Sequence, residues 1–198
     1  MWLSGGLDKY NSMLEANPTT TRIVTSGVIG ALGDLFSQHL ESKGKKEAKS
    51  VDFRRLLIFT ISAGFYFAPV IGAWFSFLNT VPIPGGDGAK ALGMLLIDQT
   101  VGACSVIGAY FFFYEFIDHL IPGGNACEPG ANPIQSIFNK GANSLKHTLP
   151  GVLVANWKVW PPINFLNFRY VPPMYQLLVS NLASFLWNIY LAGATANR

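Results

Sequence analysis

The chain alternates between long segments without charge and short polar connections. No charged residue lies between Arg55 and Asp87, and residues 56–78 form a continuous apolar and aromatic stretch. A second charge-free interval runs from Arg169 to Arg198. Because a helix of about 20 residues crosses a hydrocarbon core of about 30 Å, each interval is long enough for one membrane span.

Two further segments are mostly apolar but contain internal charges. Segment 91–117 includes Asp98, and segment 19–40 includes Arg22 and Asp34. A soluble protein can bury one such segment, but several in 198 residues leave too little chain to cover them. The pattern therefore indicates a multi-span membrane protein.

Helix-breaking residues separate these segments. The prolines and glycines of 81–86 end one apolar run, and Pro172-Pro173 precede another. We predict a single all-α membrane domain over residues 1–198, an integral helical bundle with four crossings. The predicted spans are 19–40, 54–78, 89–118 and 174–194, preceded by a short N-terminal helix over 7–15.

The segment 134–168 follows a different pattern. Its first half places apolar residues at helical spacing and lysines and asparagines on the opposite face, which is typical of an amphipathic helix in the membrane interface. Its second half is hydrophobic but contains Pro150, Pro161 and Pro162. We expect an amphipathic helix followed by a broken or re-entrant stretch, and a straight crossing by the second half is the alternative.

Composition and charge agree with this class. Charged residues make up 13% of the chain, against about 25% in soluble domains. The net charge of +3 gives no reason to expect a nucleic-acid partner. With four crossings, ten of the 14 basic residues fall on one side, which places both termini on the opposite, translocated side. These ten are Lys43, Lys45, Lys46, Lys49, Arg54, Arg55, Lys140, Lys146, Lys158 and Arg169.

Signatures of catalysis and cofactor binding are missing from the sequence. No histidine or cysteine pattern has metal-ligand spacing, no glycine-rich loop is followed by Lys-Ser/Thr, and no serine lies in a Gly-x-Ser-x-Gly context. Cys104 lies inside a predicted span and Cys127 beyond its end, so we expect no disulfide between them. We therefore expect neither an enzyme nor a bound metal or cofactor.

Polar residues inside the spans are the candidate site. A carboxylate in hydrocarbon is costly, so such groups should face the bundle interior, a partner or water. They either pin the helices together by hydrogen bonds or line an aqueous path, and we expect Arg22 or Lys158 to neutralise one carboxylate. We predict that one polar cluster near one membrane side contains Asp34, Gln38, Asp98, Gln99, Asn156, Lys158 and Trp160.

Short motifs in a fixed order carry a family resemblance. They are Asn17-Pro18, Gly33-Asp34, Asp98-Gln99, Asn156-Trp157, Trp160-Pro161 and Trp187-Asn188. Together they resemble the Mpv-seventeen/22-kDa peroxisomal membrane protein family over essentially the whole chain. The chain differs from the family pattern at Cys104, where a proline is usual, and at Gln176, where an arginine is usual.

The resemblance implies an integral protein of the mitochondrial inner membrane or, as the alternative, of the peroxisomal membrane. It also implies channel-like passage of small solutes that supports organelle homeostasis. The alternative function is a non-catalytic structural or accessory subunit that packs against a larger membrane complex. The expected partners are the lipid bilayer, small solutes, and a homo-oligomer or membrane complex.

Overall fold

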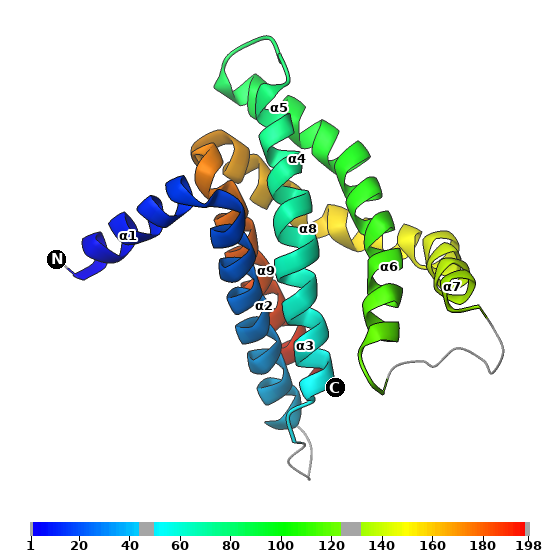
Figure 1. Cartoon of the computed structure of the whole chain (residues 1–198). Coiled ribbons are helices and arrows are strands. Elements are labelled where there is room, and N and C mark those ends of the chain that lie inside the picture. The colour runs from blue at the N-terminus through cyan, green and yellow to red at the C-terminus, as the bar shows by residue number, and fades with distance from the viewer. Residues whose placement is uncertain (1, 44–49, 124–131, 197–198) are drawn as a thin grey trace.

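The computed structural model describes residues 2–43, 50–123 and 132–196, and all regular structure in these ranges is helical (Figure 1). The prediction of an all-α fold is confirmed. In chain order the elements are α1 (Trp2–Ala16), α2 (Pro18–Lys43), α3 (Phe53–Ile61), η1 (Ser62–Phe67), α4 (Ala68–Thr80), α5 (Asp87–Ile97), η2 (Asp98–Gly102), α6 (Ala103–Leu120), α7 (Pro133–His147), α8 (Leu149–Tyr170), η3 (Pro173–Tyr175) and α9 (Gln176–Ala196).

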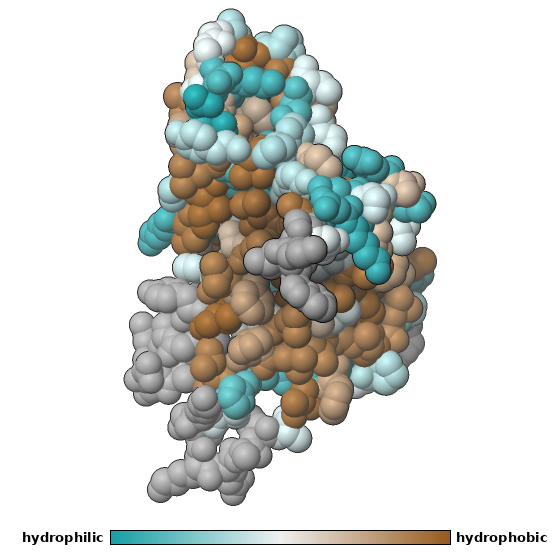
Figure 2. Space-filling model, turned by 90° about the vertical axis from the view of Figure 1, so that its left-hand side faces the viewer, coloured by the Kyte–Doolittle hydropathy of each residue, from teal (hydrophilic) through white to brown (hydrophobic). Residues whose placement is uncertain are grey.

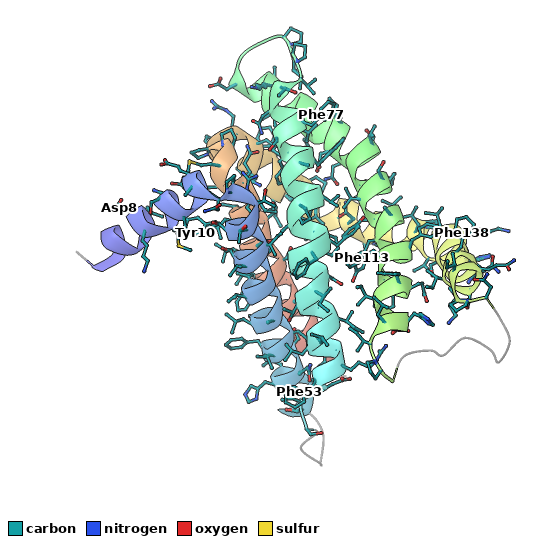
Figure 3. The ribbon with its side chains drawn as sticks, viewed as in Figure 1. Asp8, Tyr10, Phe53, Phe77, Phe113 and Phe138 are labelled. Carbon is teal, nitrogen blue, oxygen red and sulfur yellow. The ribbon has the colours of Figure 1, made fainter. Side chains whose placement is uncertain are left out.

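Two long composite helices are the most apolar parts of the structure. The helix α3–η1–α4 covers 28 residues and α5–η2–α6 covers 34, and each is interrupted only by a short π-helical segment. In the described part of the chain, these two helices are long and apolar enough to cross a membrane by length and composition. Figure 3 labels Phe53 and Phe77 near opposite ends of the first one.

The ends of these helices follow from local chemistry. The Asp52 carboxylate accepts a hydrogen bond from the Arg55 backbone N–H and caps α3. Val81 adopts an extended conformation after α4, and the prolines that follow cannot continue a helix. The connection 81–86 therefore turns the chain sharply into α5.

Helices α2 and α9 pack side by side and run in the same direction (Figure 1). Near their beginnings the Asn181 amide donates to the Ser26 hydroxyl at 2.6 Å, and farther along the Ser37 hydroxyl donates to the Asn188 carbonyl at 3.3 Å. Four consecutive crossings would make the last span antiparallel to the first. The parallel packing therefore differs from the predicted arrangement, and an additional helix must return the chain between them.

That returning helix is α8, which is continuous from Leu149 to Tyr170 with Pro161 and Pro162 inside it. The prediction of a broken stretch is wrong for these residues. Each internal proline removes a helical hydrogen bond, but such losses are tolerated where a helix is packed against its neighbours. Here α8 is held against η2 and α9 by side-chain hydrogen bonds from its asparagines, and against the start of α5 by the bond from Arg169 to Asp87.

The two ends of α8 lie near different parts of the bundle. The preceding helix α7 packs on α6, where the Phe138 and Phe112 rings are 5.6 Å apart. At the other end the Arg169 guanidinium lies 3.2 Å from the Asp87 carboxylate, beside the start of α5. The prediction that Arg169 shares a side with Arg54 is wrong, because α8 carries it to the end of the bundle that holds loop 81–86.

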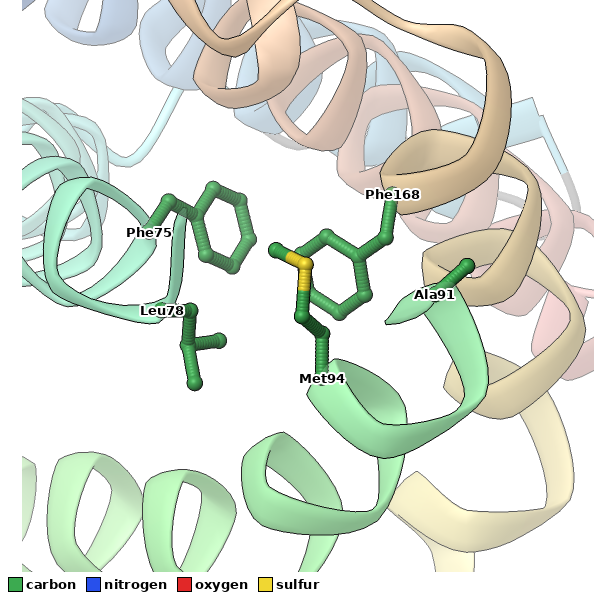
Figure 4. Close-up of a cluster of buried hydrophobic side chains, with 5 residues drawn as sticks. All are labelled: Phe75, Leu78, Ala91, Met94 and Phe168. Atoms are coloured by element: carbon green, nitrogen blue, oxygen red, sulfur yellow. The ribbon is translucent and has the colours of Figure 1, made fainter. Parts of the chain in front are cut away.

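A small apolar core joins α4, α5 and α8 (Figure 4). Its members are Phe75, Leu78, Ala91, Met94 and Phe168. Other large apolar side chains point outward, including Phe65 (66% exposed) and Leu186 (65% exposed). Figure 2 shows one such hydrophobic flank, with hydrophilic residues gathered toward the end that carries loop 81–86. An outer surface of this kind suits contact with lipid.

Candidate functional site

One face of α8 carries a row of polar and aromatic side chains. Asn156, Trp160, Asn164 and Asn167 are spaced by three or four residues and therefore lie on the same side of the helix. The three asparagine side chains donate hydrogen bonds to the side chains of other elements. This row, called the polar face of α8, points into the bundle.

The centre of the polar face meets a buried carboxylate. Asp98 is 7% exposed, and its side chain accepts hydrogen bonds from Trp74 Nε1 at 2.9 Å, from Gln99 Nε2 at 2.8 Å and from Asn164 Nδ2 at 2.8 Å. All three donors are neutral, and no lysine or arginine in the described ranges forms an ion pair with Asp98. Within the described ranges the Asp98 side chain is therefore held by hydrogen bonds from neutral groups and by no ion pair.

Gln99 extends this group toward the beginning of α8. Its side-chain oxygen accepts a hydrogen bond from Asn156 Nδ2 at 3.0 Å, and its backbone carbonyl accepts one from Trp157 Nε1 at 3.0 Å. Asp98 and Gln99 both belong to the π-helical segment η2. Single turns of π-helix inside α-helices are frequent at functional sites, because they reorient side chains and backbone groups.

Gly102 at the end of η2 makes room for the Trp74 indole. A Cβ atom at this position would lie 2.6 Å from Trp74 Nε1. Any side chain here displaces the indole or the helix. The hydrogen bond from Trp74 to Asp98 therefore depends on this glycine.

Replacing Gly102 with alanine is expected to push the Trp74 indole away from Asp98. The loss of a hydrogen bond to a charged acceptor costs about 1.5–3 kcal/mol, so the apparent melting temperature in detergent should fall and the tryptophan fluorescence should change. Gly88→Ala is the matched control, because an added Cβ there meets nothing within 4 Å. Equal melting temperatures for the two variants would contradict the close contact.

Two side-chain oxygens on the polar face are unused. Asn164 Oδ1 and Asn167 Oδ1 are buried and have no hydrogen-bond partner within the described part of the chain. Their amide nitrogens are engaged, so each side chain is fixed in orientation and presents a spare acceptor. A buried acceptor without a partner is costly, and water or a solute donor would satisfy it.

A cavity of about 390 Å³ opens at the end of the bundle near loop 81–86. It lies between the end of α4, the start of α5, the end of α8 and the start of α9. Its wall includes Asn79 and Gln176, whose side chains are joined by a 2.9 Å hydrogen bond. The Gln176 backbone carbonyl in turn accepts from Asn167 Nδ2 at 2.9 Å. The cavity is therefore connected to the polar face of α8 by direct hydrogen bonds.

Asp34 and Gln38 belong to a second polar group, which also contains Arg55. Arg55 Nε lies 2.7 Å from Asp34 Oδ1, and Gln38 Nε2 donates to Asp34 Oδ2 at 2.7 Å. The Arg55 guanidinium also bonds to Glu41 at 2.8 Å and 3.1 Å. Arg55, and neither Arg22 nor Lys158, neutralises this carboxylate.

The two polar groups lie far apart, so the predicted single cluster is not formed. Arg55 contacts Asp34 and Trp74 contacts Asp98, and 19 residues of one continuous helix separate Arg55 from Trp74. At 1.5 Å per residue this is roughly 28 Å along the helix axis. The structure brings Asp98, Gln99 and Asn156 together, whereas Asp34 and Gln38 lie elsewhere.

The other two predicted site residues are peripheral. Lys158 is exposed and Trp160 is partly buried, and within the described ranges no hydrogen bond or ion pair involves either side chain. Trp157, the neighbour of Lys158, makes the contact with Gln99 instead. The helical spacing of the α8 asparagines was the sequence signal for Asn164 and Asn167, while nothing local pointed to Trp74.

The fold and this site define an all-helical protein that gathers polar groups inside the bundle, and two helices of its described part are long and apolar enough to cross a membrane. The sequence profile of the Mpv17 / PMP22 family matches residues 136–192, which include most of α7, all of α8 and most of α9. Relatives match over almost the whole chain, as the family resemblance of the sequence motifs predicted. The chain is therefore similar to proteins of the Mpv17 / PMP22 family along almost its whole length.

Three relatives illustrate the match. Peroxisomal membrane protein 2 of Bos taurus is 29% identical over 94% of this chain and 87% of its own length. Mitochondrial inner membrane protein Mpv17 of Danio rerio is 26% identical over 96% of this chain and 97% of its own. The Homo sapiens Mpv17 protein is 29% identical over 92% of this chain and 93% of its own. No solved structure matches the chain.

The names of these relatives state the membranes in which they reside. They include a mitochondrial inner membrane protein and a peroxisomal membrane protein. The predicted setting in an organelle membrane, mitochondrial or peroxisomal, is confirmed at this level. The proteins that this chain resembles are thus named as proteins of organelle membranes.

Proposed function

We propose that this protein is a non-enzymatic conduit for small solutes, with the polar face of α8 lining the path. The observation that carries the proposal is the row of asparagines that joins the Asp98 carboxylate to the end cavity inside an apolar bundle. Two of these asparagines keep an unused buried acceptor. Polar groups inside membrane bundles are costly and commonly mark solute or ion pathways.

The proposed path begins at the cavity and passes Gln176 and Asn167 before it reaches Asn164 and Asp98. Each neighbouring pair along this route is joined by a hydrogen bond or lies one helical turn apart on α8. A passing solute exchanges hydrogen bonds with successive amides and meets a single negative charge at Asp98. Such a path favours small polar solutes over apolar ones.

The proposed topology places five helical units across the membrane: α2, α3–η1–α4, α5–η2–α6, α8 and α9. Helix α8 returns the chain to the starting side before α9, so the two termini lie on opposite sides. The parallel packing of α2 and α9 supports this arrangement. We propose the mitochondrial inner membrane as the site, with the peroxisomal membrane as the alternative.

The topology makes a direct prediction. Epitope tags at the two ends of the chain should show opposite protease sensitivity in sealed organelles. Residue 87, substituted by cysteine, should be labelled from the same side as residue 169 by a membrane-impermeant maleimide. Both tags on one side would contradict the parallel arrangement of α2 and α9.

A second candidate function is a structural or accessory subunit of a larger membrane complex. The hydrogen bonds that tie α8 to η2 and α9 stiffen the bundle in either case, and exposed apolar residues such as Phe65 offer surface to a protein partner. In that case Asp98 and the α8 asparagines are packing groups only.

Reconstitution into planar bilayers separates the two functions. The conduit predicts discrete conductance or solute flux from the purified protein alone. An accessory subunit predicts silent bilayers together with stable co-purification of other membrane proteins. Empty bilayers from protein that is correctly folded in detergent would overturn the proposed conduit.

A further inference from the structure

The wall of the end cavity contains more positive than negative side chains. A site that binds only neutral solutes by hydrogen bonds would not need these charges. Two cations, Lys90 and Arg169, line it together with one carboxylate, Asp87. The Asp87 side chain is 80% exposed and lies 3.2 Å from Arg169, so solvent screens much of its charge. Lys90 forms no ion pair within the described ranges. The cavity wall is therefore net positive.

The backbone adds to this positive character. Helix α5 begins at Asp87, and no side chain caps its first N–H groups. Asp87 and Lys90 both belong to this first turn and both line the cavity. Uncapped N–H groups at a helix start, together with the helix dipole, favour an anion. The start of α5 and the Lys90 side chain thus act on the same side of one open cavity.

The remaining walls distinguish the ligand further. Asn79 and Gln176 supply amide groups, and Met94 and Phe168 supply apolar surface next to the core of the bundle. The cavity lies at the end of the apolar helices, where Asp87, Lys90 and Arg169 gather beside loop 81–86. In the proposed topology this level lies at the boundary between hydrocarbon and water, where phosphate groups of lipids and of soluble solutes both occur.

We infer that this cavity binds the phosphate group of an anionic ligand, through Lys90, Arg169 and the first turn of α5. The phosphate belongs either to a phospholipid headgroup held at the rim or to a soluble phosphate compound. The site lies at the mouth of the proposed path, but phosphate binding there requires only the cavity and its charges and does not require that solutes pass along α8.

Removing a positive charge and removing a negative charge from the cavity should change phosphate binding in opposite directions. Residues with only a structural role would not show this dependence on the sign of the charge. Lys90→Gln should weaken phosphate binding about fivefold, and Asp87→Asn should strengthen it by a similar factor, because each changes one unit of charge beside the ligand. Lys9→Gln removes an exposed cation of α1 and should have no effect. Melting temperatures without ligand check that the three variants remain folded.

Two arms identify the source of the phosphate. In the first, inorganic phosphate is titrated into delipidated protein in a neutral detergent and the rise in melting temperature is measured. In the second, the protein is extracted from vesicles of equal parts phosphatidylcholine and phosphatidylglycerol, and bound lipids are counted by native mass spectrometry.

Each outcome decides the proposal. If binding is strongest for Asp87→Asn and weakest for Lys90→Gln in the lipid arm alone, the site holds a lipid headgroup. If the same order is found in the phosphate arm, the site holds a soluble ligand. No binding in either arm, or binding of equal strength in all variants, overturns the phosphate site. Conductance in bilayers of phosphatidylcholine is recorded separately, so a failure of the conduit is distinguishable from a failure of this site.

Discussion

Replacing Arg55 with glutamine should destabilise the protein strongly. Asp34 is 1% exposed, and the Arg55 guanidinium, 2.7 Å away, is its cationic partner. Removing one partner of a buried ion pair leaves an uncompensated charge, at a cost of about 3–5 kcal/mol. Because the Arg55 side chain is 33% exposed, we expect about 3 kcal/mol. This corresponds to a melting temperature lowered by roughly 6–12 °C.

The double variant Arg55→Gln/Asp34→Asn tests the cause. It removes both charges, and the amide introduced at position 34 can still bond to Gln38, so most of the lost stability should return. Arg169→Gln is the matched control, since its partner Asp87 is largely exposed and exposed pairs contribute at most about 1 kcal/mol. A double variant no more stable than Arg55→Gln alone would show that the ion pair is not what holds this end of the bundle.

Replacing Asp98 with asparagine should change the selectivity of the conduit while the fold persists. The substitution keeps the size of the side chain, and a rotated Asn164 amide can present its unused Oδ1 to the new amide. The fixed negative charge is lost. At about 8 Å and an effective dielectric constant of about 20, that charge is worth on the order of 2 kcal/mol to a passing ion.

The expected readout is a shift of the reversal potential in asymmetric salt. The ratio of cation to anion permeability should fall about tenfold or more. Asp34→Asn should leave the ratio unchanged, because Asp34 belongs to the separate group around Arg55. An unchanged ratio in Asp98→Asn, combined with a lower melting temperature, would assign Asp98 to packing alone.

The sequence predicted the helices better than their directions. Long charge-free intervals are dictated by the hydrocarbon thickness, and each of the four predicted spans lies within a helical stretch of the structure. The predicted direction of α9 was wrong because Pro161 and Pro162 were interpreted as a break in the preceding helix. Two adjacent prolines indicate a break, but α8 retains its helical path because hydrogen bonds from Asn156 and Asn164 hold it against η2.

The candidate site was predicted in part for a similar reason. Sequence identifies which polar residues are inside spans, and the grouping of Asp98 with Gln99 and Asn156 is observed. Asp34 lies at a different height along the bundle from this group. Asp34 lies 9 residues before the end of α2 at residue 43, whereas Asp98 lies 22 residues before the end of α6 at residue 120. Counting from helix ends would have revealed that difference, but not the contact between Asp98 and Trp74.

Cysteine scanning along α8 in a background without Cys104 and Cys127 tests the proposed path most directly. Reconstituted variants are exposed to a charged, water-soluble thiol reagent while conductance is recorded. Cysteines at 156, 160, 164 and 167 should react and reduce the current. Cysteines at 154 and 166, which replace outward-facing Val154 (49% exposed) and Leu166 (55% exposed), should not react, because lipid covers them. Full conductance with unreactive cysteines at 164 and 167 would contradict a path along the polar face of α8.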